Sequence, residues 1–369
     1  MTCMILSKVG VALTCCLLAA GTAVAQPDKP AAHFRGFADV NFAATDNHLS
    51  DDGKSHDGFS LGNLVGHVNA SLGGKFSFFG EVNVTGVDNR FSIDVARAFV
   101  RYDYNDRLKI SAGRYHAPIG YWNVAFHRGL WLQTTIFRPD IIREEWFQPD
   151  HFVGVMAEGL LVTRAGLGYI AGYGNGRDSD LGPSGLDAGD LAGPDSATPG
   201  KVSTGKHRAG VVRLFARPPQ LNGVEFGGAV YRDTLAVSFT DGVPELITSA
   251  YLAITHEAPE ILAEFSNLRH SDYYADGRSR DAWNSQAFYV QFAYRIRQQP
   301  KWKPYARFEK SLTPKDEPVT GNLENSKITA GMRYELTDFA TIKVEYGRRD
   351  KPAANNGING VFAQTAFTF

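Results

Sequence analysis

The sequence predicts an all-β fold, a transmembrane antiparallel β-barrel of about sixteen strands with short periplasmic turns and long extracellular loops. Short segments alternate apolar with polar residues at the period of a strand. The connections between them alternate in length, and the chain stops inside such a segment, Gly360–Phe369. A free edge strand invites aggregation. We therefore expect this last strand to pair with the first, Phe34–Ala43, and to close the barrel.

Residues 1–25 have the features of a cleaved signal peptide. Lys8 precedes the apolar run Val9–Ala20, and Ala23-Val24-Ala25 provides an A-x-A cleavage site. The run is too short for a spanning helix. A lipoprotein signal is disfavoured because Thr14 is a poor residue before a lipidated cysteine. We expect residues 26–369 to form a single outer-membrane barrel domain.

Composition excludes several classes of protein. All three cysteines lie in the predicted signal peptide, so the mature chain has no disulfide framework, thiol nucleophile or cysteine metal site. The formal net charge is −1, far from the positive excess that a nucleic-acid-binding protein needs. No stretch after the signal peptide is apolar for the ~20 residues of a spanning helix.

Alternating segments follow one another along the chain. They are Phe34–Ala43, Asn63–Leu72, Phe76–Thr85, Ala96–Tyr104, a segment beginning at Leu108, Phe152–Thr163, Leu167–Tyr173, His207–Arg217, Val224–Asp233, Leu246–His256, Ile261–His270, Phe288–Arg297, Trp302–Leu312, Lys327–Leu336, Ile342–Gly347 and Gly360–Phe369. Short turns alternate with longer polar loops, and Asp88–Arg90 is the one short connection expected on the long side. A soluble β-sandwich is the alternative, but nothing in it requires this asymmetry of the loops.

Charge decides which face looks outward. In these segments the charged residues take one parity and the apolar residues the other. A Lys or Arg on the lipid side at mid-membrane costs ~2–4 kcal/mol, so the charged parity should face a wet interior. On the outward parity, aromatic residues gather near the segment ends, as interfacial girdles require. Examples are Phe76, Phe78, Tyr102, Tyr104, Phe367 and Phe369.

The stretch Ala117–Pro149 breaks the alternation and is too long and too aromatic for a plain surface loop. A barrel of about sixteen strands has a lumen too wide for side chains to fill, and we expect this stretch to fold inward and narrow it. An extracellular flap or a subunit contact is the alternative. Its apolar residues would pack on the wall: Trp122, Phe126, Leu130, Trp131, Ile136 and Phe137. Its polar residues would face the opening: His127, Arg128, Arg138, Asp140, Arg143, Glu144 and Glu145.

Charged residues on the inward parity of the strands are further candidates for the pore lining, because rings of side-chain charge set ion preference. The basic ones are Arg97, Arg101, Arg213, Arg295, Arg307, Arg333 and Lys343, and Arg114 also belongs to the candidate lining. The acidic ones are Asp39, Glu81, Asp103, Glu264, Glu309, Glu335 and Glu345. Arg97 and Arg101 are the best candidates for a basic wall. Alternatively, the inward charges are paired across strands and only keep the lumen wet.

With its signal peptide, number and polarity of strands, long third extracellular segment and terminal Phe369, the chain resembles the Gram-negative porin superfamily. Residues 113–120, Gly-Arg-Tyr-His-Ala-Pro-Ile-Gly, resemble the corresponding region of the phosphate-selective porin O/P group. That group implies a lysine-rich constriction, but no lysine lies between Lys109 and Lys201, so phosphate specificity is not carried over. The resemblance also implies a homotrimer.

The sequence thus predicts a bacterial outer-membrane porin, a passive channel for small hydrophilic solutes or ions. The alternative is a barrel-borne surface hydrolase or an adhesin-like protein without a conducting pore. No catalytic, cofactor or metal site is predicted, because the histidines lack the G-x-S-x-G or H-E-x-x-H spacing of hydrolases. Aspartates in Asn175–Gly205 could hold Ca²⁺ weakly, although a solvated loop explains them better. The expected partners are solutes, outer-membrane lipid and copies of the chain.

Overall fold

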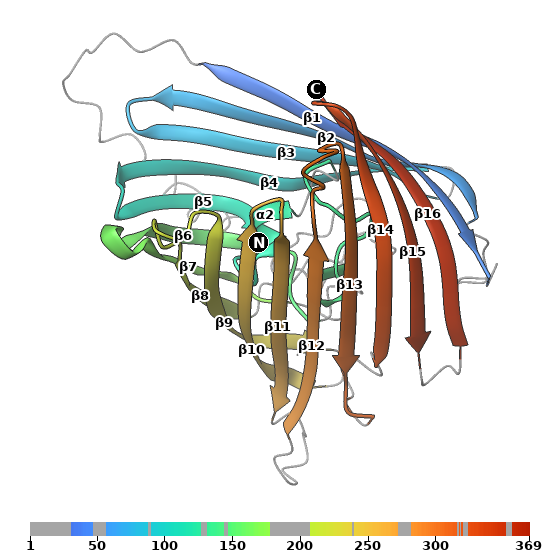
Figure 1. Cartoon of the computed structure of the whole chain (residues 1–369). Coiled ribbons are helices and arrows are strands. Elements are labelled where there is room, and N and C mark those ends of the chain that lie inside the picture. Colours follow the sequence, from blue (N-terminus) through green and yellow to red (C-terminus); the bar gives the residue numbers. More distant parts are fainter. Residues whose placement is uncertain are drawn as a thin grey trace, which may run out of the picture.

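The computed structural model describes residues 31–46, 57–87, 90–126, 131–143, 147–177, 207–237, 240–271, 282–315, 317, 319, 324–351 and 356–369. In these residues sixteen antiparallel strands form one closed barrel, as predicted (Figure 1). None of the helices in this part of the chain is long and apolar enough to span a bilayer. The predicted signal peptide and the aspartates of 178–195 lie outside the described residues.

The strands follow the chain in order around the barrel. They are β1 Ala32–Thr45, β2 Gly58–Gly73, β3 Phe76–Val87, β4 Arg90–Asn105, β5 Leu108–His116, β6 His151–Val162, β7 Leu167–Asn175, β8 Arg208–Ala216, β9 Val224–Val237, β10 Thr240–Thr255, β11 Glu260–Ser271, β12 Ala282–Ala293, β13 Trp302–Leu312, β14 Asn325–Thr337, β15 Ala340–Lys351 and β16 Asn356–Thr368. The helices are α2 Trp122–Phe126, α3 Asp140–Arg143 and a short 3₁₀ turn, Thr163–Ala165.

The first and last strands close the barrel, as the chain terminus predicts. β1 and β16 pair from Phe37 opposite Thr368 to Thr45 opposite Gly360, and Figure 1 shows them side by side. Beyond the ladder, the Gly36 N–H donates to the Phe369 carbonyl at 2.8 Å. The terminal residue is therefore bonded into the sheet, and the open edge is removed.

Several strands extend further toward the loop side than the sequence indicates. β4 begins at Arg90 instead of Ala96, β10 at Thr240 instead of Leu246, and β12 at Ala282 instead of Phe288. Backbone pairing continues there although the side chains no longer alternate cleanly, because the ladder requires only the backbone groups. As a result β10 begins at Thr240, soon after β9 ends at Val237, although the sequence predicted a loop at Thr240–Pro244.

A β-bulge in β4 changes the predicted parity of one residue. Glu81 pairs with Arg97, whereas the next residue of β3, Val82, pairs with Val95, which leaves Ala96 as the extra residue. Ala96 is fully buried and Val95 faces outward, the reverse of the alternation read from the sequence. A bulge inserts one residue into one strand, and simple period-two counting cannot detect it.

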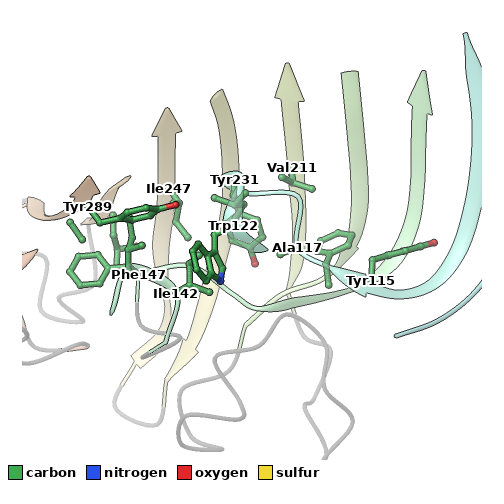
Figure 2. Packing of buried hydrophobic residues seen from close by; sticks show 14 of the residues in the cluster. Tyr115, Ala117, Trp122, Ile142, Phe147, Val211, Tyr231, Ile247 and Tyr289 are labelled. Carbon is green, nitrogen blue, oxygen red and sulfur yellow. The ribbon is translucent and has the colours of Figure 1, made fainter. Parts of the chain in front are cut away.

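The outward face of the barrel is apolar. Large side chains that face outward remain about half-exposed, among them Val100, Val290, Phe308 and Ile328. The buried apolar cluster lies on the inner side, where residues of β5–β12 meet the chain between β5 and β6 (Figure 2). The barrel therefore has a lipid-type outer surface and an interior that is partly filled by its own chain.

Candidate pore lining

Residues 117–150 join β5 to β6 and carry α2 and α3. The Asn123 side chain ties the two ends of this 117–150 segment together. Its Nδ2 group donates to the Ala117 carbonyl at 3.0 Å and to the Asp150 carbonyl at 2.8 Å. Gly120, with a φ of +69°, turns the chain where an added Cβ would lie 2.1 Å from Glu264 Oε2 of β11. The segment therefore starts in close contact with the opposite part of the barrel.

Apolar residues of the segment pack on the inner wall, as Figure 2 shows for Trp122, Ile142 and Phe147 beside Ile247 and Tyr289. Burying an indole of this size contributes a few kcal/mol. Of the residues expected to pack on the wall, Trp122 and Ile136 are buried, whereas Phe126, Trp131 and Phe137 are partly buried. Leu130 lies outside the described residues.

Wall carboxylates accept hydrogen bonds from backbone N–H groups of the segment. Glu264 of β11 accepts from Trp122 N at 2.6 Å. Glu345 of β15 accepts from Ile136 N at 2.9 Å. Irregular backbone has no ladder to satisfy its polar groups, so a buried segment of this kind requires such partners from elsewhere.

Wall cations bind the carbonyl groups of the same segment. Arg307 of β13 donates to the Phe137 carbonyl at 2.9 Å. Arg333 of β14 donates to the Trp131 and Gln133 carbonyls at 2.8 and 2.9 Å. Together with Lys343, whose Nζ donates to the Thr135 carbonyl at 3.1 Å, these contacts attach the segment to the buried face of β11–β15, which we call the covered wall.

Three of the predicted arginines, on β8, β13 and β14, are buried. Arg213 and Arg307 expose 1% of their surface and Arg333 exposes 7%. Arg213 of β8 donates to Glu225 at 2.8 Å and to the Tyr251 hydroxyl at 2.7 Å. Each of these guanidinium groups has a position set by protein partners. That they line the passage stays a prediction.

Strands β1–β4, which we call the open wall, carry the charges that remain accessible to solvent. Arg97 and Arg101 of β4 keep 24% and 33% of their side-chain surface exposed. Arg97 Nε donates to Glu81 Oε2 at 3.0 Å, and Arg101 Nε lies 2.8 Å from Asp103 Oδ1. The two best candidates for a basic wall are thus partly exposed and paired with acids.

Glu81 of β3 is buried among several positively charged or titratable groups, an arrangement that the sequence analysis missed. His67 Nε2 lies 2.9 Å from one carboxylate oxygen, and His116 Nε2 lies 3.5 Å from the other. His67 and Glu81 are directly opposite in the β2–β3 register. An inward His facing an inward Glu across a two-residue turn was the available signal, and it required the register to be known.

The other predicted lining residues are scattered. Arg138 of the segment pairs with Asp150 at 2.7 Å, and Arg295 binds Glu257 at 2.6 Å in the turns at the short-turn rim. The structure does not describe His127, Arg128, Glu144 and Glu145, nor the side chain of Arg143.

Arg114 lies near the end of β5. It pairs with Ala98 and Val153, so it takes the outward parity and not the parity of Arg101. Its side chain bends back to the Ala96 carbonyl at 3.2 Å and lies 3.8 Å from Asp94. Arg114 thus lies at the seam where β5 leaves β4, and its side chain turns toward Asp94, which is opposite inward Asn83. That it lines the passage stays a prediction.

Each predicted arginine whose side chain is described has a carboxylate within 4 Å. The pairs are Arg97–Glu81, Arg101–Asp103, Arg114–Asp94, Arg138–Asp150, Arg213–Glu225, Arg295–Glu257, Arg307–Glu309 and Arg333–Glu335. Some of these pairs join neighbouring strands, as in the alternative prediction, and others, such as Arg101–Asp103 and Arg307–Glu309, lie within a single strand. The pairing leaves the described part of the lumen with mixed charge instead of one dominant sign.

A closed barrel of sixteen strands with these features has the architecture of outer-membrane porins, and solved structures share it. The anion-selective porin from Comamonas acidovorans is 12% identical, with a TM-score of 0.64, over 92% of this chain and 100% of that one. The outer membrane channel DcaP of Acinetobacter baumannii is 14% identical, with a TM-score of 0.62, over 92% and 97%. OmpT, an outer membrane protein of Vibrio cholerae solved in a trimer form, is 13% identical, with a TM-score of 0.59, over 93% and 100%.

No protein-family model and no curated protein matches the chain. At these low identities the solved structures show the fold alone. A closed barrel with an apolar outer face satisfies every backbone group of its strands within lipid. The chain is thus a β-barrel of the bacterial outer membrane.

Proposed function

We propose that the protein is a passive channel for small hydrophilic solutes or ions, narrowed by the 117–150 segment. The observation that carries this proposal is the anchoring of the segment to the covered wall. Glu264, Arg307, Arg333 and Glu345 bind its backbone from four different strands. A loop that projected outward would not meet inward side chains of β11–β15. The passage would then run between the segment and the open wall.

The accessible charges of the open wall would set the ion preference. Arg97 and Arg101 are partly exposed, and their acidic partners keep the local charge mixed. Such a lining orients small polar solutes and favours one ion sign only weakly. We infer a modest anion preference that depends on these two residues.

A homotrimer is the assembly we propose, because the porin-like fold and the resemblance of the sequence both favour it. Chemical cross-linking of the protein in outer-membrane vesicles should yield a trimer band. A band pattern that stops at the monomer would contradict the assembly and leave the channel proposal intact.

The competing function is a surface hydrolase or an adhesin-like barrel. Single-channel recording in planar bilayers separates the two classes. A stable ohmic conductance with a nonzero reversal potential in a KCl gradient supports a channel. A folded barrel that inserts without carrying current would refute it and favour the alternative.

A further inference from the structure

Several cationic side chains of the described strands take the outward parity, where the sequence predicted apolar residues, and three of them lie on β9, β11 and β13. Arg232 of β9 and Arg269 of β11 both face Leu246 of β10 in the register. Lys310 of β13 faces Phe288 of β12. All three lie near the loop-side ends of their strands. Among the described residues, none of the three forms an ion pair or a hydrogen bond with a carboxylate.

An open apolar groove of about 440 Å³ lies next to Arg232 on the outer surface of β6–β9. Small residues of the outward parity, Ala157, Ala171 and Gly210, leave this surface hollow. Larger side chains border it: Val155, Tyr173, Val212, Val230 and Arg232. The groove is a site on the lipid side of the barrel, separate from the lumen.

The groove and the arginines belong to one row of the sheet. Tyr173 pairs with Gly210, Gly210 with Arg232, Arg232 with Leu246, and Leu246 with Arg269. Neighbouring strands lie about 4.8 Å apart, so the two arginines are about 10 Å apart on one face. Arg232 and Arg269 therefore lie beside the apolar groove, at the level of the extracellular membrane interface.

We propose that this face binds a phosphorylated lipid of the outer leaflet, with an acyl chain in the groove and phosphate on Arg232 and Arg269. Arginine binds phosphate in a fixed, two-pronged geometry. Anionic headgroups attract basic residues at the membrane surface, and charged residues are tolerated on a lipid face only near the interface. The charge of the rim and the apolar character of the groove complement the two parts of such a lipid. The proposal does not depend on whether the barrel conducts.

The test is native mass spectrometry of the full barrel in detergent, titrated with diphosphorylated lipid A and with the same lipid after chemical removal of its phosphates. The wild-type barrel should retain the phosphorylated lipid at lower concentration. The double variant Arg232→Gln, Arg269→Gln should bind it about 25-fold more weakly, since each basic group near an anionic surface contributes a factor of about five. Arg348→Gln is the control, because Arg348 is exposed on β15 and pairs with Asp350 at 3.3 Å.

Gly210→Leu tests the groove separately. An added Cβ at Gly210 meets no heavy atom within 4 Å, so the barrel should still fold, which heat-dependent gel mobility checks. The leucine should fill the hollow and reduce binding of both forms of the lipid. Equal retention of the two lipid forms by the wild type, or unchanged binding by the double arginine variant, would overturn the proposal. So would cross-links from a Tyr173→Cys variant to a second copy of the chain instead of to lipid.

Discussion

The open and covered walls of the lumen both carry charged residues, but the charges serve different partners. On the covered wall Arg307 exposes 1% of its surface and binds backbone carbonyls of the 117–150 segment. On the open wall Arg97 exposes 24% of its side chain and contacts side chains of its own wall, Glu81 and the ring of Phe79. The same residue type on the same parity is thus structural on one side and accessible to solvent on the other.

The difference shows that inward parity alone does not define a pore lining. Where the 117–150 segment is irregular, its backbone N–H and C=O groups have no partners in a sheet or helix. Buried charged side chains of the wall form hydrogen bonds with these groups instead. A buried ion pair adds little net stability, but the loss of one partner leaves an uncompensated buried charge. Mutations on the covered wall should therefore affect stability first, whereas mutations on the open wall should affect selectivity first.

Gly113→Ala should give the largest loss of stability, because the backbone of β5 lies very close to that of β4 at this position. Gly113 has a φ of +145°, and an added Cβ would lie 2.1 Å from the Ala98 carbonyl oxygen. We expect a loss of about 3 kcal/mol or more, or failure to fold. Gly66→Ala in β2 is the control, since an added Cβ there meets nothing within 4 Å. Urea unfolding in detergent micelles, followed by tryptophan fluorescence, measures both. Equal midpoints would show that the wall tolerates the strain.

Arg307→Ala should destabilise the barrel by about 3–5 kcal/mol, since it leaves Glu309 buried without its guanidinium partner. It also removes the donor to Phe137 O and Thr135 Oγ1, so mean conductance and current noise should rise. Urea unfolding and single-channel recording measure the two effects. The control is Arg348→Ala, which removes an exposed pair with Asp350 and should change stability far less. Similar losses in the two variants would remove the distinction between buried and exposed charges.

The double variant Arg97→Ala, Arg101→Ala should change selectivity more than stability. Removing two accessible cations leaves Glu81 and Asp103 without them, so the ratio of anion to cation permeability should fall by about two- to threefold. The reversal potential in a KCl gradient reports this ratio, and Arg348→Ala again serves as the comparison. An unchanged reversal potential would mean that the solute path does not pass these residues.

Lowering the pH should have a small effect on the stability of the barrel through Glu257, in the turn between β10 and β11. Burial tends to raise the pKa of the Glu257 carboxyl, but Lys303 and Arg295 outweigh it and hold that pKa below its ordinary value. The folded-state pKa is thus below the unfolded one, near ~4.3. The stabilisation is present above the unfolded pKa and is lost as the pH falls through the folded pKa.

Thermal unfolding of wild type and Glu257→Gln at pH 7 and pH 3 isolates this contribution. The wild type should be the more stable at pH 7, and the two proteins should converge at pH 3. Because Glu257 is about half-exposed, this difference in stability at pH 7 should be the smallest of the four predicted effects. A gap between the two proteins that persists at pH 3 would assign the effect to packing instead of charge.

Much of the fold could be predicted from local patterns. Period-two alternation and the terminal segment at Phe369 indicated the closed barrel and its strand number, because both depend on neighbouring residues alone. The loop-side extensions of β4, β10 and β12 were missed, since backbone pairing persists there after the side-chain pattern has ended. Ala96 was placed on the wrong face because the bulge in β4 inserts one residue that period-two counting does not detect.

Less of the candidate pore lining could be predicted from the sequence. Trp122 was correctly expected to pack on the wall, because an indole in an irregular segment has to be buried somewhere. Nothing local distinguishes Arg307, which binds the segment, from Arg97, which stays exposed. The same holds for His67 and Glu81, which come together only through the β2–β3 register.

The amino-acid sequence by itself determined a closed membrane barrel with charges facing inward, because alternation and loop length are properties of consecutive residues. The tertiary structure decided which of those charges are buried against the 117–150 segment, which remain open to water, and which few lie on the lipid side at Arg232 and Arg269. Those outcomes depend on register, bulges and the path of one irregular segment. They arise from contacts between residues far apart in the chain, which no local pattern encodes.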